Sequence, residues 1–286
     1  MTTMDGVLSE TAAFVRGRAL DGGPFVEIDE EAPTVEATRF GLETLNTLGA
    51  GPSDEERRVA TELVRACHRP DGGFAPTEAD EASALNSTYY AVRVMSAGLV
   101  DLEPDREALA RWLRAEVLPA GDTVEVDVDE LYYAIRAFQL AEIGFEQQER
   151  DAIEAFVARC ADSGGGFALL PGQAPDIERT YCCLHTLQIL GATEVAAEDR
   201  DFVAACFDGR RIHWDPEHSK PASPATMYWG SRAAQISRPP EIDWSGVAEG
   251  IDSFRRDGGG YAFDDGEPNL WLTYCGARTS DIARRA

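Results

Sequence analysis

The sequence predicts an all-α fold: a single domain, residues 1–286, in which six helical hairpins close into an α/α toroid around a central cavity. Three observations predict it. Turns of glycine followed by an aromatic residue recur along the chain, a charged amphipathic helix precedes each turn, and a less charged helix follows it. The repeat period of about 45 to 50 residues lies in the range of known repeat architectures.

The glycine turns mark the repeats. They read DGGPF from residue 21, DGGFA from 71, GGGFA from 164 and GGGYA from 258, with weaker versions PAGDTV from 119 and FDGRRIHW from 207. The segments before the turns include SDEERRVATELVRAC, EPDREALARWLRAEV and EQQERDAIEAFVARC. They carry acidic residues in the first turn and apolar residues at i, i+3 and i+4, as expected of helices with one buried face.

The segments after the turns align on a tyrosine. They read TVEATRFGLE, ALNSTYYAVR, DVDELYYAIR, DIERTYCCLH, SPATMYWGSR and NLWLTYCGAR. Five of them have tyrosine at the anchor position, namely Tyr89, Tyr132, Tyr181, Tyr228 and Tyr274, whereas the first has Arg39. These aromatic, weakly charged helices are predicted to form the inner layer of the toroid.

Composition and charge exclude some classes of partner. A formal net charge of −25, with Lys220 as the single lysine, excludes nucleic acid and anionic membranes as partners, because phosphate binding needs clustered cations. No run of 18 apolar residues and no signal peptide occur, so we expect no transmembrane segment and a cytoplasmic protein. Six cysteines are expected to be buried thiols: Cys67, Cys160, Cys182, Cys183, Cys206 and Cys275.

The repeats resemble a known superfamily. The segments CHRPDGGFAPTEADEASALNSTYYAV and GGGFALLPGQAPDIERTYCCLHTLQILGA are similar to repeats of the protein prenyltransferase β subunits and the terpenoid cyclases. The resemblance covers nearly the whole chain. It implies a toroid of six α/α hairpins and an enzyme that acts on isoprenoids.

The residues that bind zinc in the prenyltransferases are replaced. In that family an Asp and a Cys lie three and one residues before the fifth anchor, and a His lies three before the sixth. Here these positions hold Ala225, Met227 and Trp271, none of which is a usual zinc ligand. The sequence therefore predicts no catalytic zinc and no other cofactor.

The residues that bind diphosphate in that family are also replaced. The family's Arg in the third repeat and His in the fourth correspond to Asp129 and Asp176 here. Glu178 and Glu36 hold equivalent positions in the fourth and first repeats, and Asn86 lies three residues before the second anchor. Carboxylates at these positions should repel a diphosphate, so diphosphate-dependent prenyl transfer is not expected.

Three acidic residues precede the third tyrosine helix. Asp127-x-Asp129-Glu130 is similar to the D-x-D-D motif of class II terpenoid cyclases, whose middle Asp protonates an alkene or epoxide. Neighbouring carboxylates and partial burial raise a pKa, which keeps a carboxylic acid protonated. The resemblance implies that Asp129 is the acid and that Asp127 and Glu130 tune it. Helix capping by Asp127 and Asp129 is the alternative interpretation.

A carbocation would need aromatic faces around it. The candidates on the predicted inner helices are Tyr89, Tyr90, Tyr132, Tyr133, Tyr181, Tyr228, Trp229, Trp271 and Tyr274. For any single one of them, ordinary core packing is the simpler interpretation, because large aromatic side chains dominate protein cores. The sequence thus predicts a metal-independent, protonation-initiated cyclase for an isoprenoid or other polyene. Because class II cyclases usually enclose their substrate between two domains, a partner chain or a self-contained cavity would complete the site.

Basic residues favour a second hypothesis. Four positions past the anchors stand Arg93, Arg136, His185, Arg232 and Arg278. They share a helix face with the anchors, so together they could bind a polar or anionic ligand in the cavity. The alternative is that each forms a salt bridge to a carboxylate of a neighbouring helix. A third hypothesis is an interaction module without catalytic activity, whose cavity is filled by its own aromatic side chains.

Overall fold

A computed structural model describes residues 4–20, 23–28, 30–118 and 123–286. These residues form twelve helices and no strand longer than an isolated bridge, so the all-α prediction is confirmed for them. Parts of the predicted turns at 21–22 and 119–122 lie outside the described residues. The chain divides into two compact units, each described by itself, and the single-domain organisation stays a prediction.

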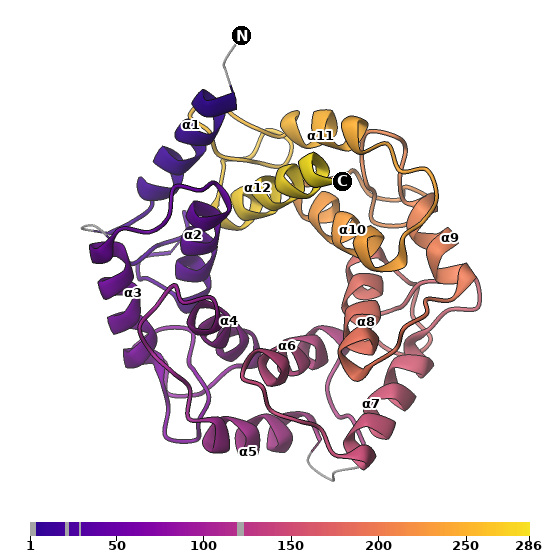
Figure 1. The fold of residues 1–286 in the computed structure, drawn as a ribbon, viewed down its shortest axis with the longest axis horizontal. Helices are drawn as coiled ribbons and strands as arrows, with labels where there is room; N and C mark the ends of the chain where they lie inside the picture. Colours follow the sequence, from indigo (N-terminus) through magenta and orange to yellow (C-terminus); the bar gives the residue numbers. More distant parts are fainter. Residues whose placement is uncertain (1–3, 21–22, 29, 119–122) are drawn as a thin grey trace. The chain divides into compact units, whose positions relative to one another are not determined.

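Unit 1 comprises Met1–Trp112, Leu140–Ile143 and Phe254–Arg278. It contains α1 (Met4–Arg16), α2 (Val35–Thr47), α3 (Asp54–Cys67) and α4 (Leu85–Ser96), part of α5 (Arg106–Val117) and the first half of α12 (Leu270–Arg285). Helices α2 and α4 pack side by side, and both α1 and α3 pack against α2 (Figure 1).

Unit 2 comprises Leu113–Gln139, Gly144–Ser253 and Thr279–Ala286. It contains most of α6 (Val128–Leu140), then α7 (Gln147–Cys160), α8 (Ile177–Leu190), α9 (Ala197–Ala205), α10 (Pro224–Ser237) and α11 (Trp244–Asp252). Helices α8 and α10 form the main pair, with α7 and α9 against α8, and α9 and α11 against α10 (Figure 1). The segments aligned on the anchor position thus form the even-numbered helices, called here the tyrosine helices.

In four of the six repeats the same hydrogen bond joins the turn to its tyrosine helix. The residue before the anchor is a threonine in four repeats, and its hydroxyl accepts from the backbone N–H of the aromatic residue in the turn. The donor–acceptor distances are 3.4 Å for Phe25–Thr38, 2.9 Å for Phe74–Thr88, 3.0 Å for Phe167–Thr180 and 3.1 Å for Tyr261–Thr273. Because buried N–H groups need a partner, this threonine fixes the turn on the helix. In the fifth repeat the Met227 sulfur accepts from Ile212.

The ring of the turn needs space on the helix. Two residues after the anchor the chain has only small side chains: Gly41, Ala91, Ala134, Cys183, Gly230 and Gly276. A Cβ at Gly41 would come within 2.5 Å of the Phe25 ring, and one at Gly276 within 2.4 Å of the Tyr261 ring. The aromatic residue of each of these two turns therefore packs directly on helix backbone.

The glycine turns also approach other backbone segments closely. Gly165 has φ of +95°, and a Cβ there would lie 2.1 Å from the Glu198 carbonyl oxygen. We expect Gly165→Ala to lower the free energy of unfolding by roughly 3 kcal/mol or more, because it combines a left-handed conformation with a backbone clash. Thermal or urea unfolding measures the loss.

Gly172 provides the matched control for this substitution. Its φ of +82° is similar, but no atom lies within 4 Å of an added Cβ. Gly172→Ala is therefore expected to cost only about 1 kcal/mol, the penalty of the left-handed conformation alone. Equal losses in the two variants would contradict the close approach of the 164–166 turn to the start of α9.

The described core is mainly apolar, with buried charged exceptions that include Arg39 and Glu43. All six cysteines are free and buried, as predicted. None of the helices in the described part of the chain is long and apolar enough to cross a membrane.

Candidate functional site

The predicted site residues divide between the two units. Unit 1 holds Glu36, Asn86, Tyr89, Tyr90, Arg93, Trp271, Tyr274 and Arg278. Unit 2 holds Asp127, Asp129, Glu130, Tyr132, Tyr133, Arg136, Asp176, Glu178, Tyr181, His185, Tyr228, Trp229 and Arg232. Each unit brings most of its members together at the tyrosine helices.

Three carboxyl groups of unit 2 gather around one arginine at the starts of α6 and α8. Arg179 contacts Asp129 directly, and its Nη1 lies 2.9 Å from Glu178 Oε2 and 3.7 Å from Asp176 Oδ2. We call Asp129, Asp176 and Glu178 the acid cluster. Sequence reasoning selected all three: Asp129 and Glu178 lie three residues before their anchors, and Asp176 corresponds to the family's His. It missed Arg179, which lies two residues before its anchor, outside the positions considered.

The acid cluster favours bound protons. Burial raises the pKa of Glu178 to about 7, and the charges of Asp129 and Asp176 add to this effect while Arg179 opposes it. Burial likewise raises the pKa of Asp176 to about 6 and raises the pKa of Asp129. One guanidinium faces three carboxyls, so full ionisation would leave a net charge of −2 in a partly buried site, which is unfavourable.

Asp129 has an asymmetric environment. Its Oδ2 contacts Arg179, whereas its Oδ1 is buried without a hydrogen-bond partner among the described residues. A buried carboxyl oxygen without a partner is uncommon, because its desolvation is not compensated. The oxygen is therefore suited to carry a proton or to contact a ligand.

Asp127 and Glu130, the other two residues of the predicted acidic motif, do not belong to the acid cluster. Asp127 Oδ1 accepts from the Glu130 backbone N–H at 3.0 Å, which is the geometry of a helix cap. The charge of Asp127 also contributes to raising the pKa of Asp129, after the larger effect of burial. The Glu130 side chain is exposed. Asp176 combines two roles. It belongs to the acid cluster, and its Oδ1 caps α8 by accepting from the Arg179 N–H at 2.9 Å.

The loop before α10 covers this site. The Trp214 carbonyl accepts from the Ile177 N–H at 2.9 Å, so the loop is joined to the first turn of α8. The Arg179 guanidinium lies 5.4 Å from the Trp214 ring centroid, and Lys220 Nζ lies 4.5 Å from it. These are cation–π distances. No repeat position pointed to Trp214, since the fifth glycine turn is degenerate in sequence.

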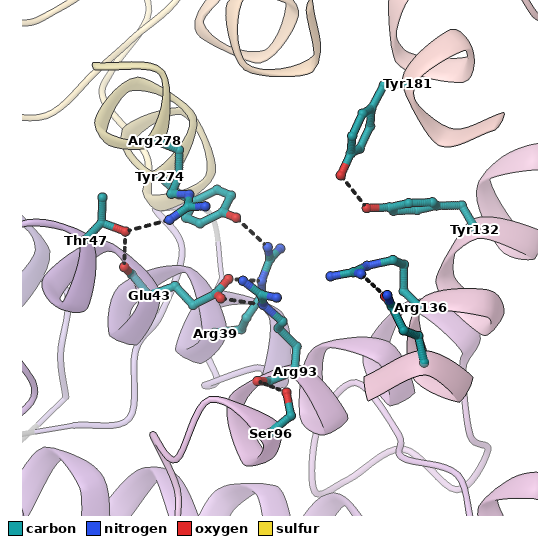
Figure 2. Close-up of polar contacts among 11 residues, drawn as sticks. Arg39, Glu43, Thr47, Arg93, Ser96, Tyr132, Arg136, Tyr181, Tyr274 and Arg278 are labelled. Carbon is teal, nitrogen blue, oxygen red and sulfur yellow. Dashed lines mark hydrogen bonds and ion pairs between the residues drawn. The ribbon is translucent and has the colours of Figure 1, made fainter. Parts of the chain in front are cut away.

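A chain of buried polar groups follows in unit 2. The hydroxyls of Tyr132 and Tyr181 lie 3.0 Å apart (Figure 2), and Tyr181 Oη lies 2.9 Å from His185 Nδ1. Arg136 Nη1 lies 3.5 Å from His185 Nε2 and can only donate. In the neutral imidazole Nε2 therefore accepts, and Nδ1 donates to Tyr181. This order leaves the Tyr181 hydroxyl to donate to Tyr132.

Aromatic rings surround that polar chain. Trp229 stacks on Tyr181 with centroids 5.4 Å apart, and Tyr228 lies 4.7 Å from Trp229. Tyr133 lies 6.1 Å from Tyr132. The Arg232 guanidinium lies 5.6 Å from the Tyr181 centroid and donates to Gln235 at 2.8 Å.

In unit 1 the aromatic candidates surround a cation that belongs to the protein. The Arg39 guanidinium, at the anchor position of the first repeat, is buried among four rings. It lies 4.5 Å from the Tyr274 centroid, 4.8 Å from Phe40, 5.0 Å from Tyr90 and 5.7 Å from Tyr89. Its Nη2 also donates to the Tyr274 hydroxyl at 2.8 Å (Figure 2). These tyrosine faces thus already stabilise one positive charge.

Glu43 neutralises part of that charge. Its Oε2 lies 2.8 Å from Arg39 Nε, and its Oε1 lies 2.6 Å from Arg93 Nε. Burial tends to raise the pKa of Glu43, but Arg39 and Arg93 outweigh this effect and lower it. Arg93 thus forms a salt bridge between α4 and α2, which is the alternative to ligand binding that the sequence left open for this residue.

The other unit 1 candidates have local partners. Burial raises the pKa of Glu36, whose carboxyl is hydrogen-bonded to Tyr90. Asn86 bonds to Ser87 at the start of α4. Trp271 lies 4.9 Å from Phe40 at the start of α12, where its backbone N–H donates to Glu27.

The positions that correspond to zinc ligands in the prenyltransferases hold Ala225, Met227 and Trp271. Met227 is buried, with its sulfur accepting from the Ile212 N–H. Within the described ranges, no three His, Cys, Asp or Glu side chains form a group that could hold a metal ion.

Comparisons with known proteins address the fold. A family model described as the prenyltransferase α/α toroid domain matches residues 19–229. A comparison with curated proteins gives no match.

Solved structures resemble the chain over nearly its whole length. The type II terpene cyclase MstE from Scytonema, in complex with its substrate geranylgeranyl dihydroxybenzoate, matches with a TM-score of 0.64 and 12% identity, covering 97% of this chain and 96% of that chain. A protein from Actinoplanes matches with a TM-score of 0.66 and 13% identity, covering 96% of this chain and 97% of that chain. Likeness at this identity shows the fold, and with the family match it confirms the predicted α/α toroid.

Proposed function

Because the chain belongs to the prenyltransferase α/α toroid family, we propose that it is a cyclase of the type II terpene kind, in which Asp129 protonates an isoprenoid or other polyene. The resemblance to MstE supports the substrate class, and the acid cluster supports the reaction type. Diphosphate-dependent transfer is not part of the proposal, because carboxyl groups hold the positions of the family's diphosphate-binding residues.

The buried Oδ1 of Asp129 carries this proposal. An acid catalyst needs one carboxyl oxygen that bears the proton toward the substrate and surroundings that stabilise the carboxylate left behind. Arg179 contacts Oδ2 and supplies the second requirement. Oδ1, buried and without a partner among the described residues, meets the first.

The acid cluster can keep this acid protonated near neutral pH. The pKa values of about 6 for Asp176 and about 7 for Glu178 mean that the cluster as a whole retains protons there, although a lone Asp would be ionised.

The reaction is balanced without a co-reactant. The alkene π electrons take the proton of Asp129 and form a C–H bond, which leaves a carbocation on the neighbouring carbon and a carboxylate on Asp129. Further double bonds of the polyene attack that cation and close rings. Loss of a proton from the last cation ends the reaction, so the product is an isomer of the substrate.

Isotope incorporation tests this function. We expect the protein to convert geranylgeranyl dihydroxybenzoate or a plain polyprenyl alcohol to a cyclic isomer of unchanged mass in ordinary water. In D2O the product should carry one deuterium, because the first step adds a proton from a carboxyl that exchanges with solvent. Mass spectrometry and NMR measure both. A cyclic product without deuterium, or no conversion of any polyene, would contradict the proposal.

A further inference from the structure

Three arginines of unit 1 share one carboxylate. Arg39 on α2, Arg93 on α4 and Arg278 on α12 surround Glu43 of α2 (Figure 2). We call these three side chains the arginine cluster. It lies among residues of unit 1 only and takes no part in the reaction proposed above.

Glu43 cannot neutralise the whole cluster. Its Oε2 is occupied by Arg39 and its Oε1 by Arg93. Arg278 forms no ion pair among the described residues, its Nε is buried without a hydrogen-bond partner, and its Nη1 lies 3.5 Å from the Thr47 hydroxyl. A donor–acceptor distance of 3.5 Å is long, so this bond compensates little of the cost of burying a guanidinium.

Among the described residues, no carboxyl group other than Glu43 forms an ion pair with these three arginines. Glu36 is the next acidic group near Arg39, but burial raises its pKa, and its carboxyl is bonded to Tyr90. Three guanidiniums against one carboxylate leave a net charge of +2 in a partly buried region. Such a region favours an anion from outside.

From these contacts we infer that the arginine cluster is an oxyanion-binding site, which takes a carboxylate or phosphate group between Arg93 and Arg278. Their remaining N–H groups present the planar fork that binds such anions with two hydrogen bonds. The Arg93 side chain is 25% exposed, so an anion can reach it from solvent. Arg39, fixed by Glu43 and Tyr274, lies behind the site and adds its charge.

Binding of two probes tests the site. The whole protein is titrated with sodium benzoate and, separately, with inorganic phosphate, each against sodium chloride at equal ionic strength, by calorimetry and thermal unfolding. We expect saturable binding and a higher melting temperature with at least one probe. The probe that binds more tightly assigns the site to carboxylates or to phosphates. Absence of saturable binding with both would overturn the inference.

Variants locate the binding. Arg278→Gln should weaken it about tenfold or more, since one charge-assisted contact is lost, while Arg278→Lys should recover part of the affinity. Glu43→Gln should bind the anion more tightly, because the competing carboxylate is neutralised. Arg111→Gln, which changes an exposed arginine of α5, is the matched control and should bind as wild type. Circular dichroism checks that each variant folds.

Two outcomes of these titrations would contradict the site: wild-type affinity in Arg278→Gln, or an equal loss in Arg111→Gln. The result does not depend on turnover, so failure of the proposed cyclase activity leaves it standing.

Discussion

Asp129→Asn is expected to lower turnover of a polyene substrate by roughly 10³-fold or more, because a positioned acid typically contributes two to four orders of magnitude. Asparagine has the shape of aspartate and can still contact Arg179, but its amide cannot give up a proton to an alkene. The measurement is the rate of cyclic product formation at saturating substrate.

Two further measurements make that result specific. Glu154→Gln replaces an exposed carboxylate of α7 and should keep wild-type turnover. Asp129→Asn should fold as wild type, since Arg179 keeps Asp176 and Glu178 as partners and the acid cluster has lost a repelling charge. Turnover within tenfold of wild type would remove Asp129 as the acid, whatever else the protein does.

Glu178→Gln is expected to be more stable than wild type above pH 7 and to lose this advantage in acid. Burial and neighbouring carboxylates raise the Glu178 pKa from 4.5 to about 7 on folding. Between these pH values the folded state holds a proton that the unfolded state releases, so wild-type stability falls as pH rises. The shift corresponds to about 3 kcal/mol at full ionisation, because each pKa unit is worth about 1.4 kcal/mol.

Glutamine does not ionise, so the stability of the variant does not fall as pH rises through the Glu178 pKa. The stability difference between variant and wild type should therefore grow from about pH 4.5 to about pH 7 and then level off. Urea unfolding across that range measures it, with Glu154→Gln as the control that shows no such trend. A difference that is constant with pH would show that Glu178 does not hold a proton in the folded state.

The fold could be predicted from the sequence because its repeats obey one local rule. Aligning the chain on the anchor located all six tyrosine helices. Thr88 and Thr180 lie one residue before their anchors and bond to the turn, and the small residues Gly41 and Gly276 lie two after. Such constraints act within one hairpin, so they appear as a fixed spacing in the sequence.

The site could be predicted only in part. Asp129 and Glu178 were found because they lie three residues before their anchors, and Asp176 was found because it corresponds to the family's His. Arg179 was missed because a long side chain at a helix start reaches beyond the face that its position suggests. For Asp127 the sequence offered tuning and capping, and the structure shows a cap on α6 together with a charge that helps raise the pKa of Asp129, while the Glu130 side chain is exposed. The contacts of Trp214 depend on a loop whose conformation no repeat spacing specifies.

Arg39 shows how a single departure from a repeat can alter a site. The repeats of the sequence place Arg39 at an anchor position, and the structure shows its contacts with the surrounding rings. It occupies the space between Tyr90 and Tyr274 with a permanent charge, which like-charge repulsion makes unfavourable for a second cation. In unit 2 the Arg232 guanidinium lies 5.6 Å from the Tyr181 centroid, so the rings of that unit also already face a cation of the protein.

The contact of Lys220 with Trp214 has a practical consequence. These 286 residues contain a single lysine, and its exposed amine lies over the indole that also contacts Arg179. Apart from the α-amino group of the chain, amine-reactive dyes have one place to attach. A polarity-sensitive fluorophore on that amine would report in real time whether the loop over the carboxyl groups moves when a hydrocarbon enters.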